Sequence, residues 1–146
     1  MSTDIREVVV GYDGSERAKT VLETARRFAS EEAGVTIVYA FRVPPETKYY
    51  EFFEDLLKAL RGDAQETVES ARALLGDRDG EVRCEAFEGR PAEVLAKVAR
   101  ERGADLIVMG TRGRGRLQSA VGSTALDLLH GAPCPVLVVP TNGETG

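Results

Sequence analysis

Hydrophobic residues fall into two kinds of pattern along the chain. Five short runs are apolar and rich in β-branched residues, which is typical of strands. Most of these runs are nearly continuous and predict strands buried on both faces, whereas apolar and charged residues alternate from Val82 to Ala86, which predicts an edge strand with one wet face. The predicted strands cover residues 7–12, 35–41, 82–86, 106–109 and 136–139.

Between these runs, apolar residues recur at spacings of three and four, which predicts four amphipathic helices. The first follows Ser15, a good N-cap, carries a buried stripe from Ala18 to Ala29 that includes Phe28, and is closed by Gly34. The second should break or kink at Gly62. The other three predicted helices cover about 49–75, 91–102 and 119–130.

Aromatic residues cluster where the second helix begins, from Tyr49 to Phe53. We expect these rings to belong to the core or to cover the sheet, because aromatic residues at helical spacing usually do. Stacking on a nucleotide base is the alternative.

The alternation of strands and helices predicts an α/β fold, because each helix is long enough for a right-handed crossover between parallel strands. We expect a doubly wound open sheet of five parallel strands in the order 3-2-1-4-5, with helices on both faces. The prediction is a single domain over residues 1–146, with a core of about 5–140 and a flexible tail at 141–146. In this order the topology reverses between strands 1 and 4, and such sheets bind ligands at the carboxyl ends of those strands.

Glycines, hydroxyls and arginines gather just after the fourth predicted strand. The glycines let backbone N–H groups turn toward an anion, and the start of the next helix adds further donors. These residues are Gly110, Arg112, Gly113, Arg114, Gly115, Arg116, Gly122, Ser123 and Thr124. The stretch predicts a phosphate-binding loop, with Arg114 and Arg116 as solvated surface. Asp13 ends the first strand and would face this loop with a carboxylate suited to ribose or adenine, unless it only forms a turn.

Composition narrows the functional classes. The net charge of −5 argues against general affinity for nucleic acid or an anionic membrane. Because the chain shows neither a bilayer-length apolar run nor signal-peptide features, we expect a cytoplasmic protein. Cys84 and Cys134 form no CxxC motif, and His130 has no nucleophile nearby in the sequence, so we expect no metal centre and no catalytic residues.

Several segments, in order, resemble the universal stress protein family. They are VVVGYDGSERA at 8–18, EGRPAEVLAKVARERGADLIVMGTRGRG at 88–115, GST at 122–124 and CPVLVVP at 134–140. The resemblance implies the five-stranded fold, binding of ATP or of ADP or AMP, and a homodimer that pairs the last strand, Val136 to Val139.

ATP-binding members of that family have a motif of Gly, two residues, Gly, nine residues, then Gly and Ser or Thr. Here eight residues separate Gly113 from Gly122, one fewer than in the motif. We expect the shortened loop to keep its function, because every glycine and hydroxyl of the motif is present. Ala40 stands where many members have a valine against the adenine. The implied nucleotide-binding residues are Tyr12, Asp13, Gly14, Ser15, Ala40, Met109, Gly110, Arg112, Gly113, Gly122, Ser123 and Thr124.

Three functional hypotheses follow. The first is a stress-response protein that binds ATP or a related adenine nucleotide, with Mg²⁺ held through phosphate, and acts as a dimeric regulator. The second is a dimeric interaction protein that binds no nucleotide, which the missing loop residue favours. The third is a slow ATPase, but Arg116 and Leu117 replace the Lys and Ser or Thr of a P-loop.

Overall fold

The computed structural model describes residues 4–111 and 122–140. Its five parallel strands form one sheet in the order β3-β2-β1-β4-β5, which confirms the predicted topology. The strands are β1 (Glu7–Gly11), β2 (Gly34–Phe41), β3 (Val82–Glu88), β4 (Leu106–Gly110) and β5 (Val136–Val139). The helices are α1 (Ala18–Phe28), the 3₁₀ helix η1 (Pro45–Tyr49), α2 (Phe53–Leu75), α3 (Pro91–Arg102) and α4 (Ser123–Gly131).

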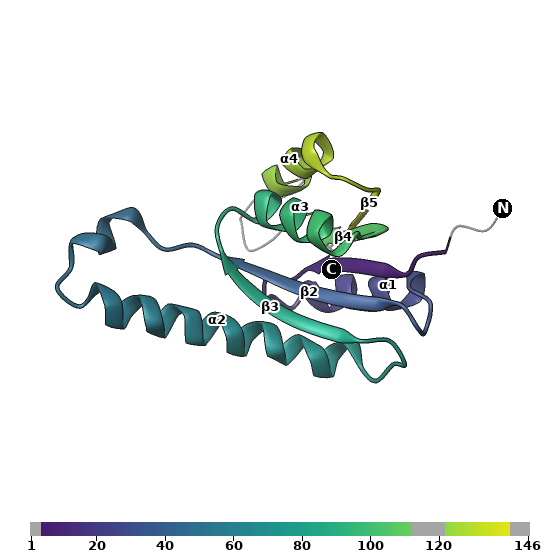
Figure 1. Cartoon of the computed structure of the whole chain (residues 1–146), viewed down its shortest axis with the longest axis horizontal. Coiled ribbons are helices and arrows are strands. Elements are labelled where there is room, and N and C mark those ends of the chain that lie inside the picture. The colour runs from purple at the N-terminus through teal and green to yellow at the C-terminus, as the bar shows by residue number, and fades with distance from the viewer. Residues whose placement is uncertain (1–3, 112–121, 141–146) are drawn as a thin grey trace.

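Helices cover both faces of the sheet, as the nearly continuous apolar runs predicted (Figure 1). In the central strand β1, Val8 and Val10 belong to the core shared with α1 and α2. Val9 points the other way, into the core shared with α3 and α4. All three side chains are fully buried. The alternation thus splits one strand between two cores and fixes β1 in the middle of the molecule.

The first helix differs from its prediction at both ends. Ser15 does not cap it: α1 begins at Ala18, and the Ser15 hydroxyl donates to Asp13 instead. The helix ends at Phe28, and Gly34 begins β2. Phe28 is 50% exposed, so this member of the predicted buried stripe does not belong to the core, whereas the following Ala29 does.

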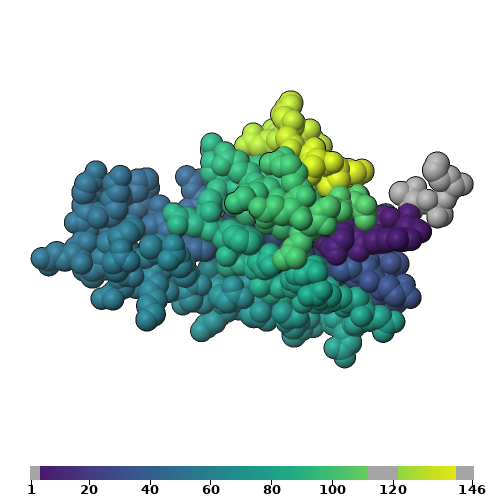
Figure 2. Space-filling view, in the orientation of Figure 1, coloured from purple at the N-terminus to yellow at the C-terminus, as the bar shows by residue number. Residues whose placement is uncertain are grey.

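The predicted break at Gly62 is wrong, since α2 runs unbroken for 23 residues. Its second half is held against the sheet by Ala64, Val68, Ala71 and Leu75, all buried. This packing outweighs the intrinsic cost of a helical glycine, about 1 kcal/mol relative to alanine. The first half of α2 and η1 extend past the end of the sheet (Figure 1; Figure 2).

This extension explains why the aromatic cluster is not core. Tyr49, Tyr50 and Phe52 are 79%, 46% and 58% exposed, because the sheet does not reach them. The prediction that these rings join the core or cover the sheet is therefore wrong for these three residues. None of them lines the cavity described below.

Helices α3 and α4 largely follow the predicted boundary signals. Pro91 takes the first position of α3, and Gly103 ends it in a left-handed conformation with φ of 62°. Helix α4 has Gly122 as its N-cap, whose N–H donates to the Thr111 carbonyl at 2.7 Å; the predicted start at residue 119 lies outside the described residues. None of the helices within residues 4–111 and 122–140 has the length and apolarity to cross a membrane.

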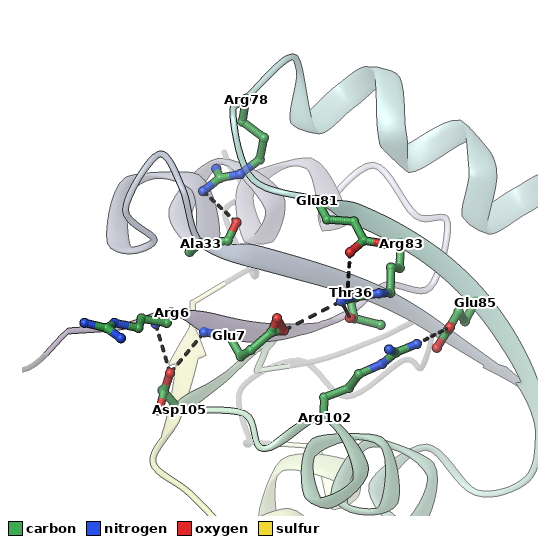
Figure 3. A network of polar contacts seen from close by, with 10 residues as sticks. All are labelled: Arg6, Glu7, Ala33, Thr36, Arg78, Glu81, Arg83, Glu85, Arg102 and Asp105. Carbon is green, nitrogen blue, oxygen red and sulfur yellow. Dashed lines mark hydrogen bonds and ion pairs between the residues drawn. The ribbon is translucent and has the colours of Figure 1, made fainter.

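A polar network holds the amino ends of the strands in register (Figure 3). Asp105, just before β4, accepts hydrogen bonds through Oδ2 from the backbone N–H groups of Arg6 and Glu7, at 2.9 and 3.0 Å. Arg83 of β3 lies 3.7 Å from the Glu7 carboxylate and 2.7 Å from that of Glu81. These contacts join β1 to the segment before β4 on one side and, across β2, to β3 on the other. They lie at the end of the sheet opposite the cavity.

Candidate functional site

A cavity of about 120 Å³ lies at the carboxyl ends of β1, β2 and β4. This is the switch point that the strand order predicted. The predicted site residues that line it are Tyr12, Asp13, Ser15, Ala40, Met109, Gly110 and Thr124. The turn after β1 and the end of β4 therefore meet at this edge of the sheet, as the strand order predicted.

Asp13 forms a tight turn and also lines the cavity. Its Oδ1 accepts two hydrogen bonds from Ser15, from the backbone N–H at 2.9 Å and from the hydroxyl at 2.6 Å. Gly14, between them, has φ of 78°, a conformation that favours glycine. Asp13 therefore shapes this turn, as one of its two interpretations predicted, and it also forms part of the cavity wall.

Tyr12 is a fixed part of the wall. Its side chain is buried, and its hydroxyl lies 3.4 Å from Ser70 Oγ on α2. Its backbone N–H donates to the Val38 carbonyl at 2.9 Å. Tyr12 therefore joins β1, β2 and α2 beneath the cavity.

Strand β2 continues past the end of β1, and this leaves part of its backbone free. The last residue of β1, Gly11, pairs with Val38. The Val38 carbonyl accepts from Tyr12, so Val38 directs its backbone groups toward β1. In a parallel strand alternate residues direct these groups to the same side, so Ala40 also points toward β1, which has already ended. Its N–H and C=O have no backbone partner on that side within the described residues, and Ala40 lines the cavity.

Gly11 keeps the cavity open at its base. A Cβ at this position would lie 3.1 Å from Leu95 Cδ1 and 3.6 Å from Met109 Cβ. Any larger side chain would therefore fill the space between α3 and β4. The run of valines that ends in Gly11 is the signal in the sequence for this close approach.

The other end of the site is the start of α4. Thr124 lines the cavity, whereas Ser123 lines a neighbouring hollow together with Thr124. The first N–H groups of a helix have no acceptor within it, so this end can bind an anion. The Gly122 N–H is already taken by Thr111. Arg112 and Gly113, like Arg114, Gly115 and Arg116, lie outside the described residues.

Several residues of the cavity wall were not predicted as part of the site. They are Gly11, Arg17, Ala18, Val21, Val38, Pro91 and Leu95. Most had been assigned to the core or to helix starts, which is correct for their packing. They reach the site because the first turns of α1 and α3 begin at the carboxyl edge of the sheet. Across residues 4–111 and 122–140, no group of three or more His, Cys, Asp or Glu side chains can hold a metal ion.

Comparison with known proteins settles the family. The model of the universal stress protein family matches residues 4–140. The chain belongs to this family. A universal stress protein of Thermus aquaticus, encoded in the 3′ region of a QAH/OAS sulfhydrylase, is 36% identical and aligns over 92% of this chain and 98% of its own.

Solved structures agree with the fold. The hypothetical protein MJ0577 superposes with a TM-score of 0.84 at 26% identity, over 97% of this chain and all of its own. A universal stress protein solved in complex with cAMP has a TM-score of 0.64 at 26% identity, over 95% of this chain and 99% of its own.

Proposed function

We propose that this universal stress protein binds ATP, or the related ADP or AMP, in the cavity between β1 and β4. We further propose that it acts in the cytoplasm as a dimeric regulator that responds to the nucleotide. Catalysis is not part of this proposal.

The free backbone of Ala40 is the observation that carries the proposal. It offers one donor and one acceptor on the edge of an otherwise apolar cavity wall formed by Val21, Val38 and Leu95. Adenine has the complementary pair, the acceptor N1 beside the amino donor N6. An apolar slot with a few fixed polar groups is the usual form of a small-molecule site.

The ribose and the phosphates of a nucleotide would also meet suitable polar groups beside this slot. The Asp13 carboxylate suits the ribose hydroxyls, and its Oδ2 accepts no hydrogen bond from residues within the described ranges. Phosphate suits the start of α4 at Ser123 and Thr124, because N–H groups and the helix dipole favour an anion there. Mg²⁺ would be held through the phosphates. The relative solved with cAMP supports this choice of ligand.

Calorimetric titration of the purified protein, stripped of carried-over nucleotide, tests the proposal. We expect saturable binding of ATP tighter than about 100 μM, equivalent to about −5.5 kcal/mol. The titration is run with and without Mg²⁺, and Ala40→Pro, which removes the backbone N–H, is the diagnostic variant. We expect Ala40→Pro to weaken binding at least about tenfold and Ala40→Gly, which keeps the N–H, to bind.

The second candidate is a dimeric interaction protein without a nucleotide. The single observation in its favour is the spacing of eight residues between Gly113 and Gly122. No binding of ATP in calorimetry and in a second, heat-independent assay would refute the nucleotide proposal and leave this candidate. Release of phosphate from ATP faster than in buffer alone would instead favour the slow ATPase.

A further inference from the structure

A second hollow, of about 540 Å³, adjoins the proposed nucleotide cavity. The two share Pro91 and Thr124, from the first turns of α3 and α4. The cavity itself, at about 120 Å³, is smaller than the roughly 300–1,000 Å³ usual for small-molecule sites. A nucleotide must therefore extend beyond the cavity, and the hollow adjoins the cavity at Thr124, in the first turn of α4 where the phosphates are proposed to bind.

Arginines from separate elements line this hollow. Arg42 follows β2, Arg90 precedes α3, and Arg100 lies further along α3. Their positive charge stands out in a chain with a net charge of −5. The starts of α3 and α4 place two positive helix ends at this hollow, while Gly131 places the negative end of α4 at it as well.

The backbone fixes Arg42 and Arg90 on one rim. The Phe41 carbonyl accepts a hydrogen bond from the Gly89 N–H at 2.9 Å, so the two arginines that come next in the chain leave the sheet side by side. Gly89 has φ of 145°, a conformation that side-chain-bearing residues rarely adopt. The turn that delivers Arg90 therefore depends on a glycine at position 89.

These two arginines are also available for an anion. Arg42 is exposed and makes no ion pair with any residue that the structure describes. Arg90 lies 3.9 Å from Glu93, an exposed pair of the kind that contributes little. The acidic residues in the hollow are Glu93 and Asp127, against the three arginines. Its net charge is therefore positive.

We infer that Arg42 and Arg90 bind the terminal phosphates of the nucleotide, so that the protein distinguishes nucleotides by the length of their phosphate chain. The inference rests on the proposed nucleotide site. Ser123 and Thr124 hold the phosphate nearest the ribose, and the two arginines hold those farther along. Guanidinium groups suit this role, because they bind phosphate oxygens through charged, often bidentate, hydrogen bonds.

The test is a ladder of calorimetric titrations with AMP, ADP and ATP against the wild-type chain and the double variant Arg42→Ala/Arg90→Ala. We expect affinity to rise from AMP to ATP in the wild type. In the double variant we expect a loss of about tenfold or more for ATP and a change within about twofold for AMP. The matched control is Arg27→Ala/Lys97→Ala, which removes two exposed cations that do not line the hollow and should leave the whole ladder unchanged.

The outcomes separate this inference from the proposed function. If AMP and ATP bind the double variant as they bind the wild type, the nucleotide site stands and the role of the arginines is refuted. An equal loss for all three nucleotides would also overturn the inference, because the arginines would then act on the part that AMP shares. Failure of the wild type to bind any of the three would overturn both proposals.

Discussion

The hydroxyl of Ser15 donates a hydrogen bond of 2.6 Å to Oδ1 of Asp13, and so holds the carboxylate that lines the proposed site. The variant Ser15→Ala keeps the backbone bond of this turn but loses the hydroxyl bond. We expect its affinity for ATP to fall about three- to tenfold, the equivalent of one ordinary hydrogen bond. Calorimetry measures the effect, and Ser15→Thr, which retains a hydroxyl, is the control. Equal affinity in all three proteins would show that Asp13 needs no support from this side chain.

Gly11 offers a way to close the cavity from within. In Gly11→Val the new side chain would run into Leu95 and Met109 and take the space of the ligand. We expect a loss of ATP affinity of more than about tenfold and a destabilisation of about 1–3 kcal/mol from overpacking. Gly11→Ala should reduce ATP affinity and stability less than Gly11→Val does, because the Leu95 methyl group that the new Cβ contacts can move. Titration and urea unfolding of both variants check this, and full binding by Gly11→Val would contradict the position of the site.

The outer edge of β5 provides a direct test of the proposed dimer. Pro135 and Val139 direct their carbonyls to β4, where they accept from Ile107 and Thr111. Alternate residues point the other way, so the backbone of Val138 faces outward. Val138→Pro removes an outward N–H without removing a bond to β4, and we expect it to yield monomers by light scattering at concentrations where the wild type is dimeric. Val138→Ala, which keeps the N–H, should remain a dimer; a dimeric proline variant would exclude this edge.

Two glycines should respond to alanine with opposite signs. Gly62 lies inside α2, where a Cβ added to it would have nothing within 4 Å, and its φ is not positive. Gly62→Ala should therefore stabilise the protein by about 0.5–1 kcal/mol. Gly103 is equally open but has φ of 62°, so Gly103→Ala should destabilise by about 1 kcal/mol. Urea unfolding measures both, and the same sign for the two variants would contradict the backbone described for one of them.

Cys84 should make stability fall at high pH. Burial raises the pKa of this thiol above its ordinary value of 9.0, although the nearby Arg72 guanidinium acts in the opposite direction. Above about pH 9 the unfolded thiol loses its proton while the native thiol keeps it, so a rise in pH favours unfolding. We expect the free energy of unfolding to decrease more steeply between about pH 8 and pH 10 in the wild type than in Cys84→Ala. Parallel slopes in urea titrations would contradict a raised pKa.

The pattern of apolar residues was sufficient to predict the sheet, because a parallel strand buried on two faces leaves a signal that few other structures share. Val8, Val9 and Val10 show why: every side chain of the strand must be apolar, whichever core it meets. The errors arose where tertiary contacts override local preference. Gly62 was expected to break a helix whose other half is anchored by Val68 and Leu75.

The sequence predicted some of the residues that line the cavity and missed others. Asp13 and Gly110 both line it, because the strand order alone brings the ends of β1 and β4 together. Leu95 and Val38 were assigned to the core and not to the cavity, because burial against a ligand and burial against protein select the same apolar side chains. Ser15 was predicted as a helix cap, but its hydroxyl donates to Asp13 instead. A serine hydroxyl can bind a helix end or a carboxylate, and the sequence does not distinguish the two partners.

Strand β2 extends past the carboxyl end of β1, which leaves the backbone N–H and C=O of Ala40 without a neighbouring strand. Every amino acid except proline presents the same donor and acceptor at that position. A substitution at position 40 can therefore widen or narrow the cavity, while the backbone donor and acceptor offered to a ligand stay the same. Size selectivity and polar recognition are, at this one residue, separately adjustable.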